Sequence, residues 1–201
     1  MRKGISIISV SCLVFLLMWG TNLNPVSAYD IDQAIGLSYP SGFQDVVDFY
    51  DDVPWLEVDR LSPVGLFYRL LVNYDSGMRT DVGVGPLTYV IGDVAYDDIP
   101  LTLTIGYNFN SKGSFNPYVR GGLSYHFIDG DYVKDTKPVG PFGALGVEFM
   151  KNKPWQFFVE VAYDGAEATM KVDEYRYGFG TYRKTEDINP MGVMVSAGFM
   201  F

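Results

Sequence analysis

Six charged residues stand in stretches of the chain that are otherwise apolar or small. These residues are Arg69, Arg79, Asp81, Arg120, Glu148 and Glu160. A charge removed from water is costly unless an opposite charge pairs with it. Both signs are present, so the set can form either a network of salt bridges or a charged filter for a passing solute. We favour the salt-bridge network.

His126 is the only histidine in the sequence, and Ser124 precedes it by two residues. A histidine with a serine and an acid nearby is an arrangement that hydrolases use. Residues two apart on a strand, however, are separated by about 6.6 Å along its axis, and that exceeds hydrogen-bond reach. We therefore interpret Ser124 and His126 as polar residues at a rim and expect no enzymatic activity.

Segment 40–63 is acidic, with Arg60 as its one basic residue. Its acidic residues are Asp45, Asp48, Asp51, Asp52, Glu57 and Asp59. Carboxylates of this kind could bind Ca²⁺ or Mg²⁺, but their spacing matches no EF-hand loop, and a solvated acidic loop is the better interpretation. No Cys/His cluster is spaced for zinc, and no glycine motif for nucleotides occurs. We expect no metal and no cofactor.

The first 28 residues have the composition of a secretory signal peptide. Arg2 and Lys3 precede an apolar run that ends near Trp19, and the small residues 26–28 follow it. This order of charge, apolar run and small residues is typical of a leader that is cleaved. The run is shorter than the roughly 20 apolar residues that a spanning helix needs. We predict a signal peptide at 1–28 and one mature domain at 29–201.

Composition restricts what the mature domain can be. Removing Arg2 and Lys3 leaves 13 basic against 24 acidic residues, a net charge of −11. Nucleic-acid binding needs a basic face, so we expect no nucleic-acid partner. After the leader, no segment has the length of a membrane-spanning helix. If the mature chain enters a membrane, it must do so as a closed barrel, in which every backbone group pairs with a neighbouring strand.

The pattern of apolar residues supports such a barrel. Residues alternate between apolar and small, polar or charged types in 64–74, 101–109, 155–164 and 191–201. Weaker alternation occurs in 31–39, 78–85, 118–127 and 142–149. Segments of about ten residues that face lipid and lumen by turns are the signature of outer-membrane barrels. The sequence therefore predicts an all-β fold: an eight-stranded antiparallel up-and-down transmembrane β-barrel.

The connections between these segments also alternate. Short turns are expected at 75–77, 110–115 and 150–154, and long outer loops at 40–63, 86–100, 128–141 and 165–189. Aromatic residues near the inner strand ends are typical of a membrane-interface girdle; they are Tyr74, Tyr107, Phe149, Trp155 and Phe201. The alternative is a soluble sandwich or lipocalin-like barrel, but the larger apolar face would then have to fill a narrow interior.

Two of the long loops have internal patterns. Phe43, Val46, Val47 and Tyr50 fall near helical spacing, which predicts a short amphipathic turn over the barrel mouth. Segment 165–189 alternates aromatic residues near its centre, and we expect it to extend the last two strands as a hairpin above the membrane.

The second half of the chain resembles the outer-membrane protein W family of eight-stranded barrels. The similar stretches run from Ile99 to Phe109, from Phe115 to Tyr125 and from Ile188 to Phe201. Phe199 and Phe201 resemble the C-terminal signal by which the barrel assembly machinery recognises its substrates. The resemblance implies a bacterial outer-membrane location, contact with outer-membrane lipids, and passage of small hydrophobic solutes through a narrow barrel or sideways through its wall.

The charged residues that would point inward depart from the apolar interior that the resemblance implies. Two functions therefore stay open. The first is porin-like transport of small hydrophobic molecules. The second is a non-conducting barrel with a salt-bridged lumen, whose acidic outer loops bind partners or lipid headgroups.

Overall fold

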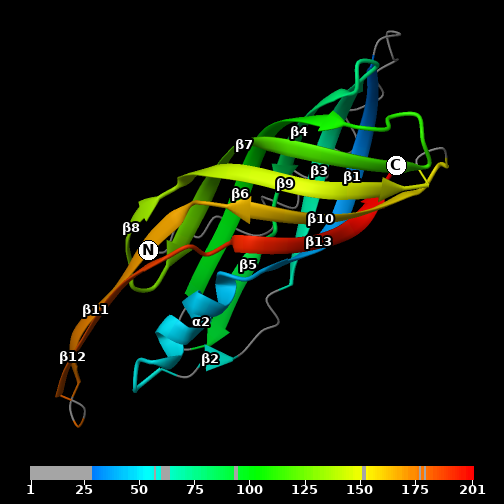
Figure 1. Ribbon diagram of the computed structural model, residues 1–201. Helices are drawn as coiled ribbons and strands as arrows, with labels where there is room; N and C mark the ends of the chain where they lie inside the picture. Colours follow the sequence, from blue (N-terminus) through cyan, green and yellow to red (C-terminus); the bar gives the residue numbers. More distant parts are fainter. Residues whose placement is uncertain are drawn as a thin grey trace.

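A computed structural model describes residues 29–201 except for a few short segments (Figure 1). The described residues are 29–56, 58–59, 64–92, 95–150, 153–176, 178 and 180–201. The predicted signal peptide lies outside them, as do Glu57 and Arg60 of the acidic loop. Within the described part of the chain, no helix has the length and hydropathy that crossing a membrane would require.

Eight antiparallel strands close into a barrel, which confirms the predicted fold class. Their order around the barrel is β1-β3-β4-β6-β7-β9-β10-β13, and β13 pairs back to β1. The strands are β1 (Tyr29–Pro40), β3 (Gly65–Tyr74), β4 (Met78–Val84), β6 (Ala95–Asn108), β7 (Phe115–Gly130), β9 (Val139–Phe149), β10 (Gln156–Asp164) and β13 (Gly192–Met200). Closure leaves no unpaired edge within the ring, as a membrane-spanning sheet requires.

The two faces of the strands have the reverse of the arrangement in a soluble protein. Leu103, Ile105 and Leu145 are 63%, 60% and 66% exposed on the outer surface. The intervening positions face the lumen and are buried, and many of them are polar or charged. The apolar residues on the outer surface are therefore placed to contact lipid, because a soluble barrel would bury them.

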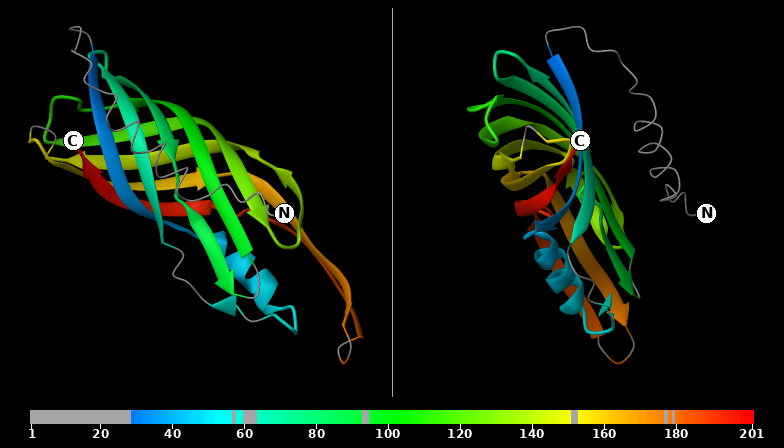
Figure 2. Two further views of the ribbon diagram at one scale, coloured as in Figure 1. Left: turned by 180° about the vertical axis from the view of Figure 1, so that it is seen from behind. Right: turned by 90° about the vertical axis from the view of Figure 1, so that its right-hand side faces the viewer.

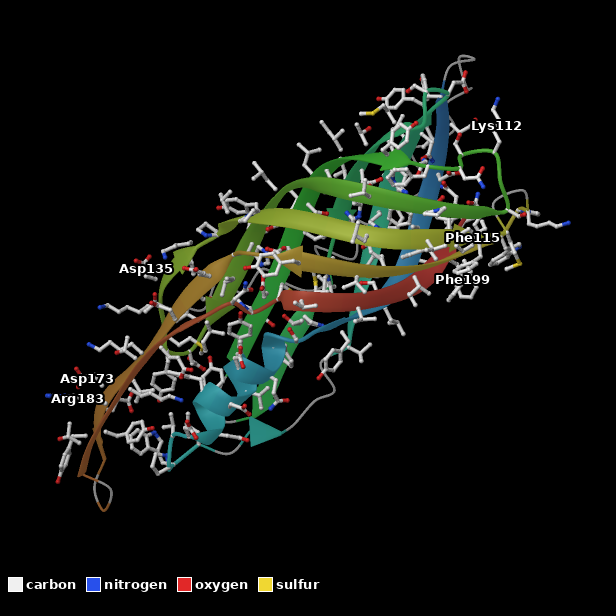
Figure 3. The ribbon with its side chains drawn as sticks, viewed as in Figure 1. Lys112, Phe115, Asp135, Asp173, Arg183 and Phe199 are labelled. Carbon is white, nitrogen blue, oxygen red and sulfur yellow. The ribbon has the colours of Figure 1, made fainter. Side chains whose placement is uncertain are left out.

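A group of aromatic rings surrounds one end of the barrel, where the chain also ends. Phe115 packs edge-on against Phe149, and Trp155 packs against Phe199. Figure 3 shows Phe115 and Phe199 at the same end. This end carries the short turns, so it is the periplasmic end, and the rings form the expected interface girdle. Phe201 closes the barrel there: its N–H and C=O bond to the backbone of Gln33 at 2.9 and 2.8 Å.

At the opposite end several strands extend beyond the alternating segments predicted from the sequence, and a hairpin coloured orange projects from the barrel (Figure 2). The sequence predicted long loops at 86–100 and 128–141, and for most of their length this was wrong. The structure places β5 (Thr88–Gly92) and β8 (Val133–Lys137) there, and β6 and β7 extend into both segments. The β6–β7 ladder reaches Tyr96 opposite Gly130. Backbone pairing does not require apolar side chains, so the ladder continues where the alternating pattern stops.

The predicted hairpin in segment 165–189 is confirmed. Strands β11 (Glu167–Arg176) and β12 (Gly180–Ile188) pair throughout and project beyond the barrel, with β8 on the far side of β11. Asp173 and Arg183 lie near the tip of the hairpin (Figure 3) and form an exposed ion pair at 3.0 Å.

The predicted helical turn is also confirmed: α2 (Phe43–Asp51) covers the outer mouth, and β2 (Val58–Asp59) follows it. Phe49, Val46 and Tyr50 are fully buried and pack against apolar residues of β11 and β12. The Tyr50 hydroxyl donates to the Asp131 carbonyl at 2.6 Å, and burial raises the pKa of this phenol well above its usual value. Lys184 lies over the Phe49 ring at 4.8 Å and pairs with Asp52 at 2.8 Å. Helix and hairpin therefore form one cap, whose apolar core also includes Tyr96 at the outer end of β6.

The first prediction concerns this cap. Phe49→Ala removes a fully buried ring and should destabilise the cap by about 3–5 kcal/mol. Amide hydrogen exchange in α2 and β12 should then become faster while exchange in the barrel strands stays the same. Equal acceleration in both regions, or in neither, would contradict the existence of a separate cap core.

A second prediction concerns Phe201, whose role as an insertion signal is our proposal. Phe201→Ala keeps the two backbone hydrogen bonds to Gln33 but removes the ring. We expect less folded protein in the outer membrane, measured by the heat-modifiable mobility of the barrel on gels. The outward-facing Phe115→Ala serves as a matched control, because it removes a girdle ring that is not at the C-terminus. Normal amounts of the Phe201 variant would refute the proposed signal.

Candidate functional site in the barrel lumen

The six charged residues singled out in the sequence come together inside the barrel. They are contributed by five strands, β3, β4, β7, β9 and β10, and each is at most 5% exposed. We call them the charged layer: Arg69, Arg79, Asp81, Arg120, Glu148 and Glu160. Three cations face three anions, so the layer as a whole is neutral.

Glu160 is the most heavily bonded member of the charged layer. Its carboxylate accepts from Arg120 through Nε at 2.8 Å and Nη2 at 2.6 Å, which is a bidentate pair. It also accepts from Arg69 Nη1 at 3.0 Å and from the Tyr118 hydroxyl at 2.9 Å. One carboxylate thus joins β3, β7 and β10 across the lumen.

Arg79 forms the other half of the layer. Its Nη1 donates to Glu148 at 2.7 Å and to Asn108 at 3.2 Å, and its Nε donates to Asp81 at 3.3 Å. Asp81 links the two halves, because its second oxygen lies 3.8 Å from Arg120 Nε. Each buried charge of the layer therefore has an opposite charge as its partner, as burial requires.

Aromatic rings fix the guanidinium planes. Arg69 lies 4.5 Å from the centroid of Phe158, Arg79 4.4 Å from Tyr118 and Arg120 4.6 Å from Phe142. A guanidinium stacked on a ring gains a cation–π attraction that is strongest when both groups are out of water. The arginines are consequently held in place by packing as well as by charge.

Ser124 and His126 belong to a second polar cluster nearer the outer mouth. His126 Nδ1 lies 3.0 Å from the Asp98 carboxylate, and Nε2 lies 3.1 Å from Asp164. Ser124 donates its hydroxyl to Asp164 at 2.6 Å. With a carboxylate at each ring nitrogen, the doubly protonated imidazolium satisfies both contacts.

This outer cluster lacks the geometry of a catalytic triad. The serine hydroxyl has one proton, and it points to Asp164, so it does not face the His126 ring as a nucleophile activated by a base would. All four residues are at most 2% exposed. They therefore link β6, β7 and β10 beneath the cap, deeper than the rim position that we expected from the sequence.

Sequence reasoning missed several partners in these two clusters. Asp98 fell in a segment that was predicted to be a loop, although it continues the inward positions of Thr102 and Thr104. Asp164 ends the alternating segment 155–164, but the sequence did not connect it to His126. Tyr118 and the asparagines around the charged layer were not singled out, because neither their residue type nor their spacing set them apart.

A small cavity of about 20 Å³ lies on the outer side of the charged layer. Arg69, Arg120 and Glu160 form its floor. Its walls are mostly apolar, with Phe67, Phe142, Ala162 and Met194. Hydroxyls of Ser38, Ser196 and Thr102 also line it, and it reaches Gly83, Gly85 and Pro86, where β4 ends.

A third prediction tests the charged layer. Glu160→Gln keeps the side-chain shape but leaves two arginines without their shared carboxylate. Removing one partner of a buried ion pair costs about 3–5 kcal/mol, and we expect a loss of that size in unfolding by urea. The control is Glu167→Gln, because Glu167 pairs with Lys137 at 2.6 Å on the exposed surface, where water screens the pair and its contribution to stability is small. Equal losses of stability would show that Glu160 does not hold the charged layer together.

Comparisons with known proteins agree with this architecture. The chain resembles three solved outer-membrane proteins: OprG of Pseudomonas aeruginosa, AlkL in lipid bilayers and outer membrane protein W of E. coli. The TM-scores are 0.57, 0.52 and 0.50, and the sequence identities 14%, 14% and 17%. The alignments cover 86%, 91% and 88% of this chain and 94%, 94% and 100% of those chains.

At these identities the likeness shows the fold alone. No curated protein sequence matches the chain. A family model does match it, over residues 78–201, and this is more than half of the sequence. The chain therefore belongs to the OmpW family and is a barrel of the bacterial outer membrane.

Proposed function

We propose that the barrel aids passage of small hydrophobic molecules across the outer membrane. The observation that carries this proposal is the cavity with apolar walls on the outer side of the charged layer. Apolar surface inside a narrow lumen is not needed to pair the charges below it, and it offers a place for an apolar solute to leave water.

The route that we infer does not follow the barrel axis. Arg69 and Arg120 both donate to Glu160 across the lumen, at 2.6–3.0 Å. A solute could pass straight through only by separating these buried charges, and that is costly. An exit through the barrel wall, above the charged layer, avoids this cost.

The wall is interrupted at the level of the cavity. Regular pairing of β4 ends at Val84, and β5 begins at Thr88. Pro86 lies between them and has no N–H to donate to a neighbouring strand. Gly85 N–H still donates to the Pro100 carbonyl at 2.8 Å and Leu87 N–H to the Leu66 carbonyl at 3.1 Å, so the ladder is irregular here but not absent. We place the lateral exit beside Gly83, Gly85 and Pro86, because the regular ladder breaks there next to the cavity.

The second candidate function is a non-conducting barrel that acts through its surface. The bonded charged layer favours it, and so does the cap, whose apolar core fills the outer mouth. Acidic side chains of segment 40–63 would then meet partners or lipid headgroups. The paired replacement Arg120→Ala with Glu160→Ala separates the two functions: lower stability with unchanged uptake would support the surface role.

A fourth prediction tests passage directly. The probe is N-phenyl-1-naphthylamine, an apolar dye that fluoresces on entering lipid, added to outer-membrane vesicles with and without the refolded protein. We expect faster uptake with the protein. Ala162→Val should return uptake to the protein-free rate, because the two added methyl groups occupy the small cavity. Ala197→Val is the matched control, since Ala197 lies on the exposed outer face of β13.

Two results would count against transport. Uptake that is the same with and without folded protein would show that the barrel does not conduct the dye. Equal uptake by the Ala162 and Ala197 variants, both faster than in protein-free vesicles, would show that the route avoids the cavity.

A further inference from the structure

We propose that the cavity is a subsite for one neutral hydrogen-bond acceptor, so that the preferred solutes are apolar molecules with a single uncharged oxygen, such as ketones and esters. This inference rests on the proposed function, because it specifies what enters the same cavity. It adds a selectivity that apolar walls alone would not give.

The first observation is an unused donor on Arg69. This arginine is 3% exposed, and its Nη1 is bonded to Glu160. Its Nε is buried and has no hydrogen-bond partner among the described residues. Phe67 and Phe158 hold the guanidinium, at 5.1 and 4.5 Å from their ring centroids. The side chain therefore cannot turn freely to satisfy that N–H, and a buried N–H without an acceptor is unfavourable.

The second observation is that Arg69 lines the cavity together with hydroxyl groups. Ser196 donates to Ser38 at 2.8 Å, and this leaves the Ser38 proton available to an acceptor. Thr102 contributes a third hydroxyl to the lining. The polar side of the cavity thus presents donors, and it complements a ligand that accepts.

The charges around the cavity decide between a neutral and an anionic acceptor. Glu160 lies in the floor with both oxygens already bonded to arginine, and the charged layer is neutral without any ligand. Arg69 and Arg120, the two cations of the lining, are therefore already paired. A carboxylate ligand would lose its hydration in the cavity and find no unpaired cation there, which is costly. A carbonyl oxygen carries no such penalty.

The dimensions fit a polar group and not a whole solute. A volume of about 20 Å³ holds roughly one water-sized group. The carbon chain of the ligand would lie against Phe142 and Met194 of the walls; methionine is flexible and adapts to irregular apolar shapes. The cavity would then orient the oxygen toward Arg69 and direct the apolar tail toward Gly85 and Pro86.

The experiment uses protein labelled with ¹⁵N-arginine and refolded in lipid nanodiscs. The Nε–H resonance of Arg69 is assigned by its loss in Arg69→Lys. Three seven-carbon probes are then added in turn: heptan-2-one, heptane and heptanoate. We expect heptan-2-one to shift the Arg69 resonance while heptane and heptanoate leave it in place. Arg79 and Arg120 are internal controls, because their Nε–H groups already donate to Asp81 and Glu160.

Ala162→Val provides a second readout that leaves Arg69 intact. It should abolish the shift caused by heptan-2-one, and a shift that persists would place the binding site elsewhere and overturn the proposal. An equal shift with heptanoate would overturn the preference for neutral oxygen. No shift with heptan-2-one, in a protein that still speeds dye uptake, would refute the subsite and leave the transport function standing. A shift without faster uptake would support the subsite and refute transport.

Discussion

The structure depends on one buried carboxylate shared by two arginines. Glu160 holds Arg69 and Arg120 within 3.0 Å, and all three side chains lie inside a barrel whose interior is only just wide enough for its own residues. The outer surface is assigned to lipid, so the apolar residues that would fill a soluble core are not available for the lumen. Paired charges fill that space instead, and their pairing links strands that are not neighbours in the ring.

This constraint divides the lumen into levels. Below the Glu160 hub, Arg79 joins Asp81, Glu148 and Asn108 in a fully bonded polar region. Above it lies the small cavity with apolar walls, and then the cluster around His126. The cap of α2, β11 and β12 covers the outer mouth. In the proposed function, a closed axis with an apolar recess above it would direct a solute toward the side of the barrel, and the irregular ladder at Pro86 is important for that reason.

Much of the fold could be predicted from the sequence because of one simple rule: the residues of a membrane-spanning strand face lipid and lumen by turns. Leu101, Leu103 and Ile105 alternate with Thr102 and Thr104, and the structure has them on opposite faces. The same rule placed all six residues of the charged layer in the lumen. It could not say which charge pairs with which, because this depends on the strand register and on distances across the barrel. Arg69 and Glu160 are 91 residues apart, and no local pattern connects them.

The rule also stopped working where the lipid ends. Beyond the membrane, β6 and β7 no longer need an apolar outer face, so Asp97 and Asp129 stand opposite each other in a regular ladder that the sequence suggested was a loop. Asp98 was missed as a partner of His126 for this reason. The unused Nε–H of Arg69 has no sequence signal at all, since it follows from the angle at which the guanidinium meets Glu160.

The central claim is that the charged layer closes the barrel axis, and electrical recording in planar lipid bilayers tests it most directly. The refolded wild-type protein should insert without producing steps of ionic current, because no continuous column of water passes Glu160 and its arginines. Steady, reproducible current steps from folded wild-type protein would contradict the account, since they would require an open axial pore through the charged layer.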